Sequence, residues 1–341
     1  MSSSKPRPKV VVIGGGTGTY TTLIGLKKYP LDISVIVTMM DSGGSNRIIR
    51  DEFGLLPTSD IRQAMVALAS EEVDDLFRKL FTYRYSQGTG LNGMTFGNLF
   101  MLALTDILGS QSEAVTQTCR LLGVQGQIIP VTLDNSQLIA RYENGRQVLG
   151  EHYIDEPSEE FAQSRIVELD TIPEARANPD AISAILNADY LIFAPGDLYT
   201  SLLSNLVVKG IKEAILKSKA KKIYILSLMT KHGQTNQFRA SDYCAELSKY
   251  LNGHNPDYIL INKKLKLSHK ILKRYQEEKA EPVIDDLNEH PENLIGSKII
   301  KGNFISNIIF EKAKGDKLNR SLVRHDSQKL AKAIVRIIQG K

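Results

Sequence analysis

The stretch VVVIGGGTGTY, residues 10–20, decides the fold. Val10–Ile13 are all apolar and β-branched, which predicts a strand buried on both faces, as in a parallel sheet. Four glycines within Gly14–Gly18 follow without a spacer, and Thr19–Lys28 predicts a helix. The glycines therefore lie between the carboxyl end of a strand and the amino end of a helix, where free N–H groups and the helix dipole attract phosphate.

The usual nucleotide fingerprints do not fit this glycine loop. The small residue that a G-x-G-x-x-G/A dinucleotide motif requires is a threonine in either register, Thr19 or Thr21, and no lysine follows as in a Walker A loop. Asp41 ends the next expected strand, 32–39, where NAD-binding proteins carry a ribose-binding acid. An NAD-dependent oxidoreductase therefore stays as a third interpretation, behind other phosphate-bearing ligands.

The composition is that of a globular protein, with 42% hydrophobic and 24% charged residues among 341, and a formal net charge of +5. The lysines lack the interleaved aromatic residues of nucleic-acid-binding surfaces, so we expect no nucleic-acid partner. Cys119 and Cys244 are too few for a disulfide framework or a cysteine zinc site. With neither a signal-peptide pattern nor a bilayer-spanning apolar run, we expect a cytoplasmic protein without membrane insertion.

Strand-like and helix-like segments alternate along most of the chain. This alternation predicts a Rossmann-like α/β fold, a mostly parallel sheet with helices on both faces. We expect a flexible tail at 1–8 and a nucleotide-binding core at 9–262, with an insertion around 127–180. Residues 263–341 are expected to form a smaller C-terminal extension that packs on the core and contributes to the ligand cleft.

The insertion contains short apolar segments in close succession. Strands are expected at 127–132, 137–142 and 146–150, and their spacing predicts an antiparallel set. The acidic, proline-containing stretch 151–180 is expected to connect this set to the next core strand, at 190–194.

A second loop with binding potential, MMDSGGSNRIIRDEFGLLPTSDIRQ at 39–63, follows the second strand. Its glycines let the backbone approach a ligand, its first acid can hold a ribose or a metal, and its arginines can neutralise phosphate or form surface ion pairs. Asp60 is expected to cap a helix. The candidate ligand-binding residues are Asp41, Gly43, Gly44 and Ser45, and the arginines are Arg47, Arg50 and Arg62.

Two further loops, GTGLNGMTFGNLF at 88–100 and APGDLYTS at 194–201, precede expected helices. Their asparagines can recognise a base or a sugar, although an ordinary polar turn fits the first loop equally well. The second loop follows a buried strand, and its aspartate can bind hydroxyl groups or a cation. The candidates are Asn92, Asn98, Gly196, Asp197 and Tyr199.

These loops are expected to share one cleft, because ligands of open α/β sheets bind outside the carboxyl ends of the strands. A few charge-assisted hydrogen bonds of roughly 1.5–3 kcal/mol each supply only part of the about 8 kcal/mol of micromolar binding. We therefore expect a diphosphate linked to a base and a sugar. No serine elbow or zinc-protease histidine motif occurs, so the sequence assigns no catalytic residue.

Five motifs occur in order along the chain: VVIGGGTGTY, DSGGSNRIIRDEFGLLPTSDIRQ, NGMTFGNLF, APGDLYTS and RHDSQKLA. Over roughly residues 9–335 they resemble the gluconeogenesis factor family (YvcK-like), which is similar to the 2-phospho-L-lactate transferases (CofD-like). The resemblance implies a 2-phospho-L-lactate transferase-like fold and one of two activities. One is UDP-sugar binding by a regulatory factor for gluconeogenic growth, carbon metabolism and cell-wall morphogenesis, with no required cofactor. The other transfers a phospholactyl or phosphoenolpyruvyl group from a guanylylated donor to a deazaflavin precursor, with Mg²⁺.

The resemblance also implies roles for individual residues. Matched by position, Gly15, Gly16, Thr17 and Gly18 face the diphosphate, Asp41 and Asn98 the nucleotide or metal, and Gly196 and Asp197 form the opposite wall. Tyr275 and Arg324 would lie near the sugar nucleotide. Asp41 and Asp197 would bind Mg²⁺ only in the transferase. A regulatory protein partner and a homo-oligomer are possible in either case.

The chain departs from the family pattern at three places, in two of these motifs. The usual DDGGSSGRLR is DSGGSNRIIR here, PPGD is PTSD, and GPGS is APGD. Ser42 thus replaces the second of two adjacent acids, which together are natural ligands for a magnesium ion bridging a diphosphate. This loss favours the binding factor over the transferase, which remains the alternative.

Overall fold

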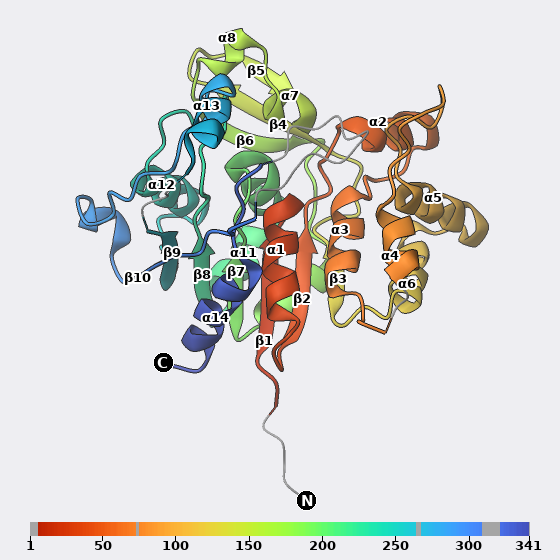
Figure 1. The fold of residues 1–341 in the computed structure, drawn as a ribbon, viewed down its shortest axis with the longest axis horizontal. Helices are drawn as coiled ribbons and strands as arrows, with labels where there is room; N and C mark the ends of the chain where they lie inside the picture. Colours follow the sequence, from red (N-terminus) through yellow and green to blue (C-terminus); the bar gives the residue numbers. More distant parts are fainter. Residues whose placement is uncertain (1–5, 73–74, 264–266, 309–320, 341) are drawn as a thin grey trace, which may run out of the picture.

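The computed structural model describes residues 6–72, 75–263, 267–308 and 321–340 (Figure 1). A seven-stranded parallel sheet in the order β10-β9-β8-β7-β1-β2-β3 forms its centre. The expected Rossmann-like α/β fold is therefore confirmed. The strands are β1 (Lys9–Gly14), β2 (Asp32–Val37), β3 (Gln127–Pro130), β7 (Tyr190–Phe193), β8 (Lys221–Ile225), β9 (Tyr258–Asn262) and β10 (Lys298–Gly302). Residues 1–5 of the expected tail lie outside the described residues.

The chain reverses its direction across the sheet between β1 and β7. From β1 it proceeds through β2 to β3, whereas from β7 it proceeds the opposite way through β8 and β9 to β10. Val10–Ile13 of β1 are at most 2% exposed, as the apolar run predicts. The neighbouring ends of β1 and β7 are thus the topological switch point, where open α/β sheets bind their ligands.

Helices cover both faces of the sheet (Figure 1). Helices α1 (Gly16–Leu26), α3 (Ser59–Leu68) and α14 (Ser327–Ile338) pack side by side in front of it, and α9 (Pro179–Leu186) packs with α11 (Ile211–Lys217) on the other side. Helix α12 (Ala240–Tyr250) lies between β8 and β9 in the chain. The reversal at the switch point explains the two layers, because right-handed crossovers that run in opposite directions place their helices on opposite faces.

A second sheet with antiparallel strands lies beside the carboxyl ends of the main sheet (Figure 1). It consists of β4 (Gln137–Tyr142), β5 (Gln147–Leu149) and β6 (Ile166–Ile172). The expectation of one antiparallel set at 127–150 was therefore wrong in two respects. β3 pairs in parallel with β2, and the stretch 151–180, expected to be a connection, supplies β6.

The loops near the switch point contain more helix than the sequence predicted. Helix α2 (Gly44–Phe53) lies within the second expected loop, 39–63, and a π-helix (Leu198–Leu203) follows the APGD stretch. The remaining helices are α4 (Asp75–Thr82), α5 (Phe96–Leu108), α6 (Gln111–Leu121), α7 (Glu151–Asp155), α8 (Glu159–Ala162), α10 (Ser204–Leu206), α13 (His269–Glu277) and a 3-10 turn (Pro291–Leu294). Among the described helices, none has the length and apolar character needed to cross a bilayer.

The C-terminal segment is built into the core. It supplies the edge strand β10, and the N-cap residue of α14 is Asp326, whose carboxylate accepts the N–H groups of Gln328 and Lys329. A small apolar cluster joins Ile271 and Tyr275 of α13 to the segment before α14. This cluster places residues 321–325 beside the carboxyl ends of the strands.

The packing of α1 on α14 requires a residue without a side chain at position 25. A Cβ on Gly25 would lie 2.1 Å from the backbone oxygen of Ser327 and 2.9 Å from the Cβ of Ala331. We expect Gly25→Ala to lower the free energy of unfolding by about 1–3 kcal/mol in urea denaturation, because overpacking outweighs the gain in helix propensity. Gly90→Ala, with no atom within 4 Å of the added methyl, is the control. Unchanged stability of Gly25→Ala would contradict the close packing.

Candidate functional site

The glycine loop after β1 and the APGD loop after β7 are in direct backbone contact. A Cβ on Gly18 would lie 1.7 Å from the carbonyl oxygen of Pro195, so no larger residue fits there. Gly16 has φ +64°, a conformation that favours glycine. The Ser227 hydroxyl, just after β8, donates to the Gly196 carbonyl at 2.6 Å and fixes the second loop from its other side.

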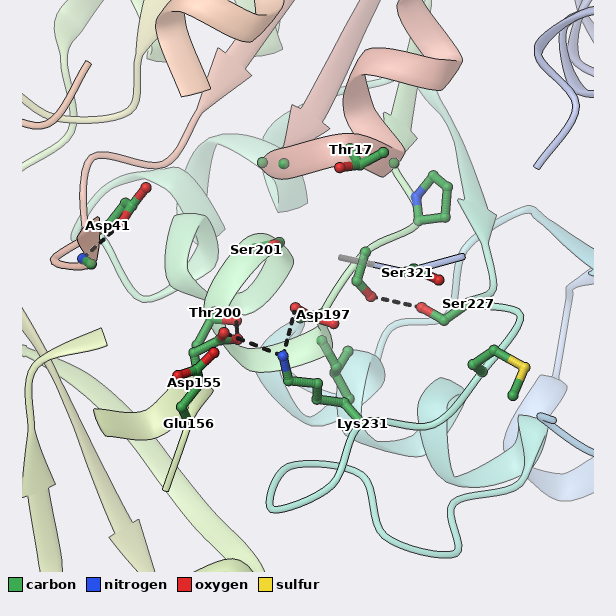
Figure 2. Close-up of a pocket in the computed structure, with 18 of the residues that line it drawn as sticks. Thr17, Asp41, Asp155, Glu156, Asp197, Thr200, Ser201, Ser227, Lys231 and Ser321 are labelled. Atoms are coloured by element: carbon green, nitrogen blue, oxygen red, sulfur yellow. Dashed lines mark hydrogen bonds and ion pairs between the residues drawn. The ribbon is translucent and has the colours of Figure 1, made fainter. Parts of the chain in front are cut away.

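A cavity of about 640 Å³ opens above this contact (Figure 2). Its volume is typical of small-molecule sites. All four expected loops contribute to its wall, together with α7, the loop after β8 and residues 321–325. Of the predicted residues, those on the wall are Gly15, Gly16, Thr17, Gly18, Asp41, Gly43, Gly44, Asn92, Gly196, Asp197, Tyr275 and Arg324.

Other predicted residues lie away from this wall. Tyr199 is fully buried, and its hydroxyl donates to the Ile166 carbonyl. Asn98 is also fully buried and accepts a hydrogen bond from Arg62 Nε at 2.9 Å. The side chain of Ser45 lies outside the described part of the structure.

The three arginines of the second loop do not line the cavity. Arg62 is buried against Asn98, Arg50 donates to the Ser136 carbonyl, and Arg47 forms an exposed ion pair with Asp51. These contacts do not support the expectation that the three arginines neutralise a phosphate in the cavity.

Asp60 contacts the glycine loop and does not cap α3. The residue at the N-cap of α3 is Thr58, and the Asp60 carboxylate accepts the Gly16 N–H at 2.9 Å. This contact corrects the expectation that Asp60 is a helix cap. The next two amides, of Thr17 and Gly18, have no intrahelical acceptor in an α-helix that begins at Gly16. Both residues line the cavity, and amides at the start of a helix are potential donors for an anion.

Helix α7, which follows β5 of the small sheet, forms hydrogen bonds with the loop after β2. The Ser42 N–H donates to Glu151 Oε2 at 3.1 Å, and the Ser42 hydroxyl accepts the His152 N–H at 2.9 Å. Burial raises the pKa of Glu151 well above its ordinary value, and the carboxylates of Asp41 and Asp155 raise it further. This carboxyl therefore keeps its proton at a pH where an exposed glutamate is ionised.

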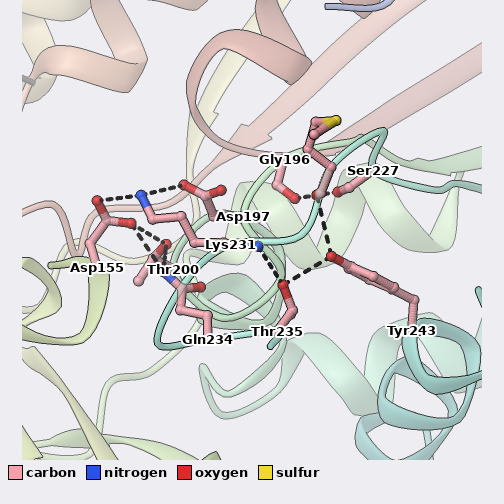
Figure 3. A network of polar contacts seen from close by, with 10 residues as sticks. Asp155, Gly196, Asp197, Thr200, Ser227, Lys231, Gln234, Thr235 and Tyr243 are labelled. Atoms are coloured by element: carbon pink, nitrogen blue, oxygen red, sulfur yellow. Dashed lines mark hydrogen bonds and ion pairs between the residues drawn. The ribbon is translucent and has the colours of Figure 1, made fainter. Parts of the chain in front are cut away.

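Lys231, in the loop after β8, bridges two carboxylates on the cavity wall (Figure 3). Its Nζ lies 3.2 Å from Asp155 Oδ2 and 3.7 Å from Asp197 Oδ2. Burial alone would lower the pKa of Lys231, but attraction by Asp197 and Asp155 outweighs it and raises the pKa overall. Lys231 is therefore a fixed positive charge at neutral pH.

The C-terminal segment closes the cavity through Tyr275. The Tyr275 hydroxyl accepts the N–H groups of residues 322 and 323, at 3.1 and 3.0 Å. These two hydrogen bonds hold the segment that contains Arg324 and the buried His325 at the cavity wall. Burial lowers the pKa of His325 to about 4, so its imidazole is neutral at pH 7.

The cavity wall includes charged residues that the sequence reasoning missed. Glu151 and Asp155 come from the acidic stretch that was expected to be a connection. Lys231 follows β8 within a few residues. The rule that ligands bind at the carboxyl ends of strands would have identified this lysine, whereas no local pattern marks the two acids.

The described side chains do not by themselves form a magnesium cage. Asp41 accepts the Gly43 N–H at 2.9 Å and Asn46 Nδ2 at 2.6 Å, while Asp197 lies beside the ammonium of Lys231. In the described ranges, no three His, Cys, Asp or Glu side chains gather in a metal-binding arrangement. Magnesium stays a prediction of the transferase alternative.

The proton on Glu151 has a consequence for stability. Because its pKa is raised in the folded state, the folded protein holds a proton that the unfolded chain releases above about pH 4.5, so this group lowers stability as pH rises. We expect Glu151→Gln to become progressively more stable than the wild type between pH 5 and pH 7.5 in urea unfolding. Glu52→Gln, at an exposed position of α2, is the control. Parallel pH profiles for the wild type and Glu151→Gln would contradict this assignment.

Comparison with known proteins places the chain in a family. The model of the 2-phospho-L-lactate transferase CofD family matches residues 10–305. A relative from Thermotoga maritima is 41% identical over 330 residues, covering 96% of this chain and 99% of its own. A gluconeogenesis factor from Bacillus subtilis is 34% identical over 335 residues, covering 98% of this chain and 99% of its own.

A solved structure agrees with this assignment. The crystal structure of a UPF0052 family protein from Bacillus halodurans superposes with a TM-score of 0.86 at 33% identity, covering 97% of this chain and all of the other. The chain therefore belongs to the 2-phospho-L-lactate transferase CofD family, and its similarity to gluconeogenesis factors extends over nearly its whole length.

Proposed function

We propose that the protein binds a nucleotide sugar of the UDP-sugar class in the cavity at the switch point. In this proposal it is a regulatory factor linked to gluconeogenic growth, central carbon metabolism and cell-wall morphogenesis. The observation that carries the proposal is the meeting of the glycine loop and the APGD loop in one cavity of about 640 Å³. The gluconeogenesis factors among its relatives support the regulatory role.

The glycine loop offers the site for the diphosphate. Thr17 and Gly18 present backbone donors at the amino end of α1, where the helix dipole favours negative charge. Arg324 and Arg84 place guanidinium groups on the same cavity wall. Charge-assisted hydrogen bonds from these groups would offset the repulsion between a diphosphate and the nearby carboxylates.

Position 42 supports binding without transfer. The N–H and the hydroxyl of Ser42 both form hydrogen bonds with α7, so this residue links α7 to the loop after β2. The second acid of the family pattern is thus absent where a transferase would use it to hold magnesium. Transfer of a phospholactyl or phosphoenolpyruvyl group remains the alternative, and NAD-dependent oxidation is a weaker third candidate.

We further propose a setting for this binding factor. It would act in the cytoplasm, where nucleotide sugars are available, and would signal through a regulatory protein partner or a homo-oligomer. The binding itself would require no cofactor, because the donors named above come from the chain.

Isothermal titration calorimetry with UDP-N-acetylglucosamine, UDP-glucose, GDP with Mg²⁺, and NAD tests the ligand class. We expect binding of the UDP-sugars without Mg²⁺. Arg324→Ala should weaken that binding by about tenfold, the effect of one charge-assisted hydrogen bond, and Arg336→Ala, exposed on α14, should leave it unchanged. Binding of GDP alone with Mg²⁺ would support the transferase, and binding of NAD alone the oxidoreductase.

A matched pair of glycine variants tests the glycine loop. Gly16 and Gly109 have nearly the same backbone angle, φ +64° and +66°, but Gly109 ends α5 in open space. Gly16→Val should raise the dissociation constant for UDP-glucose at least about tenfold, because the strained backbone moves the Thr17 amide. Gly109→Val introduces the same strain and should bind like the wild type. Equal binding by both variants would show that the loop is only structural.

A further inference from the structure

The bridge formed by Lys231, Asp155 and Asp197 is held in place by further hydrogen bonds on the cavity wall. The Lys231 backbone N–H donates to Thr235 Oγ1 at 2.8 Å, and the Tyr243 hydroxyl holds that threonine at 3.0 Å (Figure 3). These two hydrogen bonds hold the loop that carries Lys231 in place.

The second carboxylate oxygen of Asp155 is also used within the protein. Asp155 Oδ1 accepts hydrogen bonds from Gln234 Nε2 at 3.0 Å and from Thr200 Oγ1 at 3.3 Å, while Oδ2 faces Lys231. The Asp155 and Lys231 side chains are 22% and 25% exposed, whereas Asp197 is 40% exposed. Asp197 is therefore the most exposed of the three side chains of the bridge, and it lies on the cavity wall (Figure 2).

The charge of the bridge determines what it can bind. One ammonium and two carboxylates sum to a net charge of −1, and the exposed Glu156 adds another carboxylate to the same wall. A phosphate group would be repelled there. A hydroxyl group fits, because its O–H can donate to Asp197 and its oxygen can accept from the ammonium, which has three donors.

This wall lies next to the expected diphosphate site. Asp197 directly follows Gly196, whose added Cβ would lie 3.7 Å from the Gly15 carbonyl oxygen. A ligand with its diphosphate on the Thr17 and Gly18 amides would thus place the next group along its chain against the bridge. In a nucleotide sugar the diphosphate lies between the ribose and the sugar, so the group against the bridge carries hydroxyls in either orientation.

We propose that the bridge is the sugar-recognition end of the cavity, where Asp197 accepts ligand hydroxyls and Lys231 is the specificity-determining residue that holds Asp197 in place. This inference rests on the proposed function, and it adds which end of the cavity would contact the sugar. Burial raises the pKa of Asp197 and the ammonium of Lys231 opposes that shift, whereas for Lys231 the two carboxylates outweigh the lowering of its pKa by burial.

Calorimetric titration of UDP and UDP-glucose into the whole chain tests the proposal. The variant Lys231→Met with Asp155→Asn removes one positive and one negative charge, so the bridge keeps its net charge of −1. We expect UDP-glucose to bind at least about tenfold more weakly to this double variant, and UDP to change less than threefold. Lys219→Met, at an exposed lysine that does not line the cavity, is the control for both ligands.

The outcomes separate the inference from the proposed function. Equal weakening of UDP and UDP-glucose, or no weakening of either, would overturn the role of Lys231 while leaving UDP-sugar binding in place. A wild type that binds neither ligand would contradict the proposed function, and the inference with it. Should the double variant unfold, Lys231→Arg keeps the charge with a different donor geometry, and it should weaken UDP-glucose selectively. Unchanged UDP-glucose affinity in a folded Lys231→Arg would also overturn the proposal.

Discussion

The structure depends on the close contact between two backbone turns at the centre of the sheet. β1 and β7 pair in parallel, and the loops that follow them approach so closely that Gly18 has no room for a side chain beside Pro195. Buried β-branched residues fix β1 in the middle of the sheet, with about 1.5–3 kcal/mol gained for each large side chain removed from water. Because this pairing sets the positions of both loops, it also creates the cavity between them.

The wall of this cavity carries groups that attract an anion and groups that repel one. Backbone amides at the start of α1 and the guanidinium groups of Arg324 and Arg84 favour an anion, whereas Asp41, Asp155 and Asp197 disfavour one. The protein reduces this conflict in two ways. Glu151 retains its proton, and the ammonium of Lys231 offsets the negative charge of Asp155 and Asp197. In our proposal, the first set of groups binds the diphosphate of a nucleotide sugar and Asp197 accepts its hydroxyl groups.

The sequence predicted the parts of the site that follow directly from strand ends. The glycine loop, Asp41 and the APGD loop each follow a strongly apolar strand, so their convergence could be inferred from the fold class. It did not predict β6, because the alternation of Ile166–Ile172 belongs to a strand with one solvated face inside an acidic stretch. Asp60 was misassigned because a carboxylate near a helix start fits a cap as well as a contact with a distant loop. Such long-range partners have no local sequence pattern.

A crystal structure of the protein with UDP-glucose is the most direct test of this account. The account predicts that the diphosphate oxygens accept hydrogen bonds from the Thr17 and Gly18 amides, between the loops that follow β1 and β7. It also predicts the glucose hydroxyls within hydrogen-bond distance of Asp197. A diphosphate bound elsewhere, with the space between these two loops empty, would contradict it.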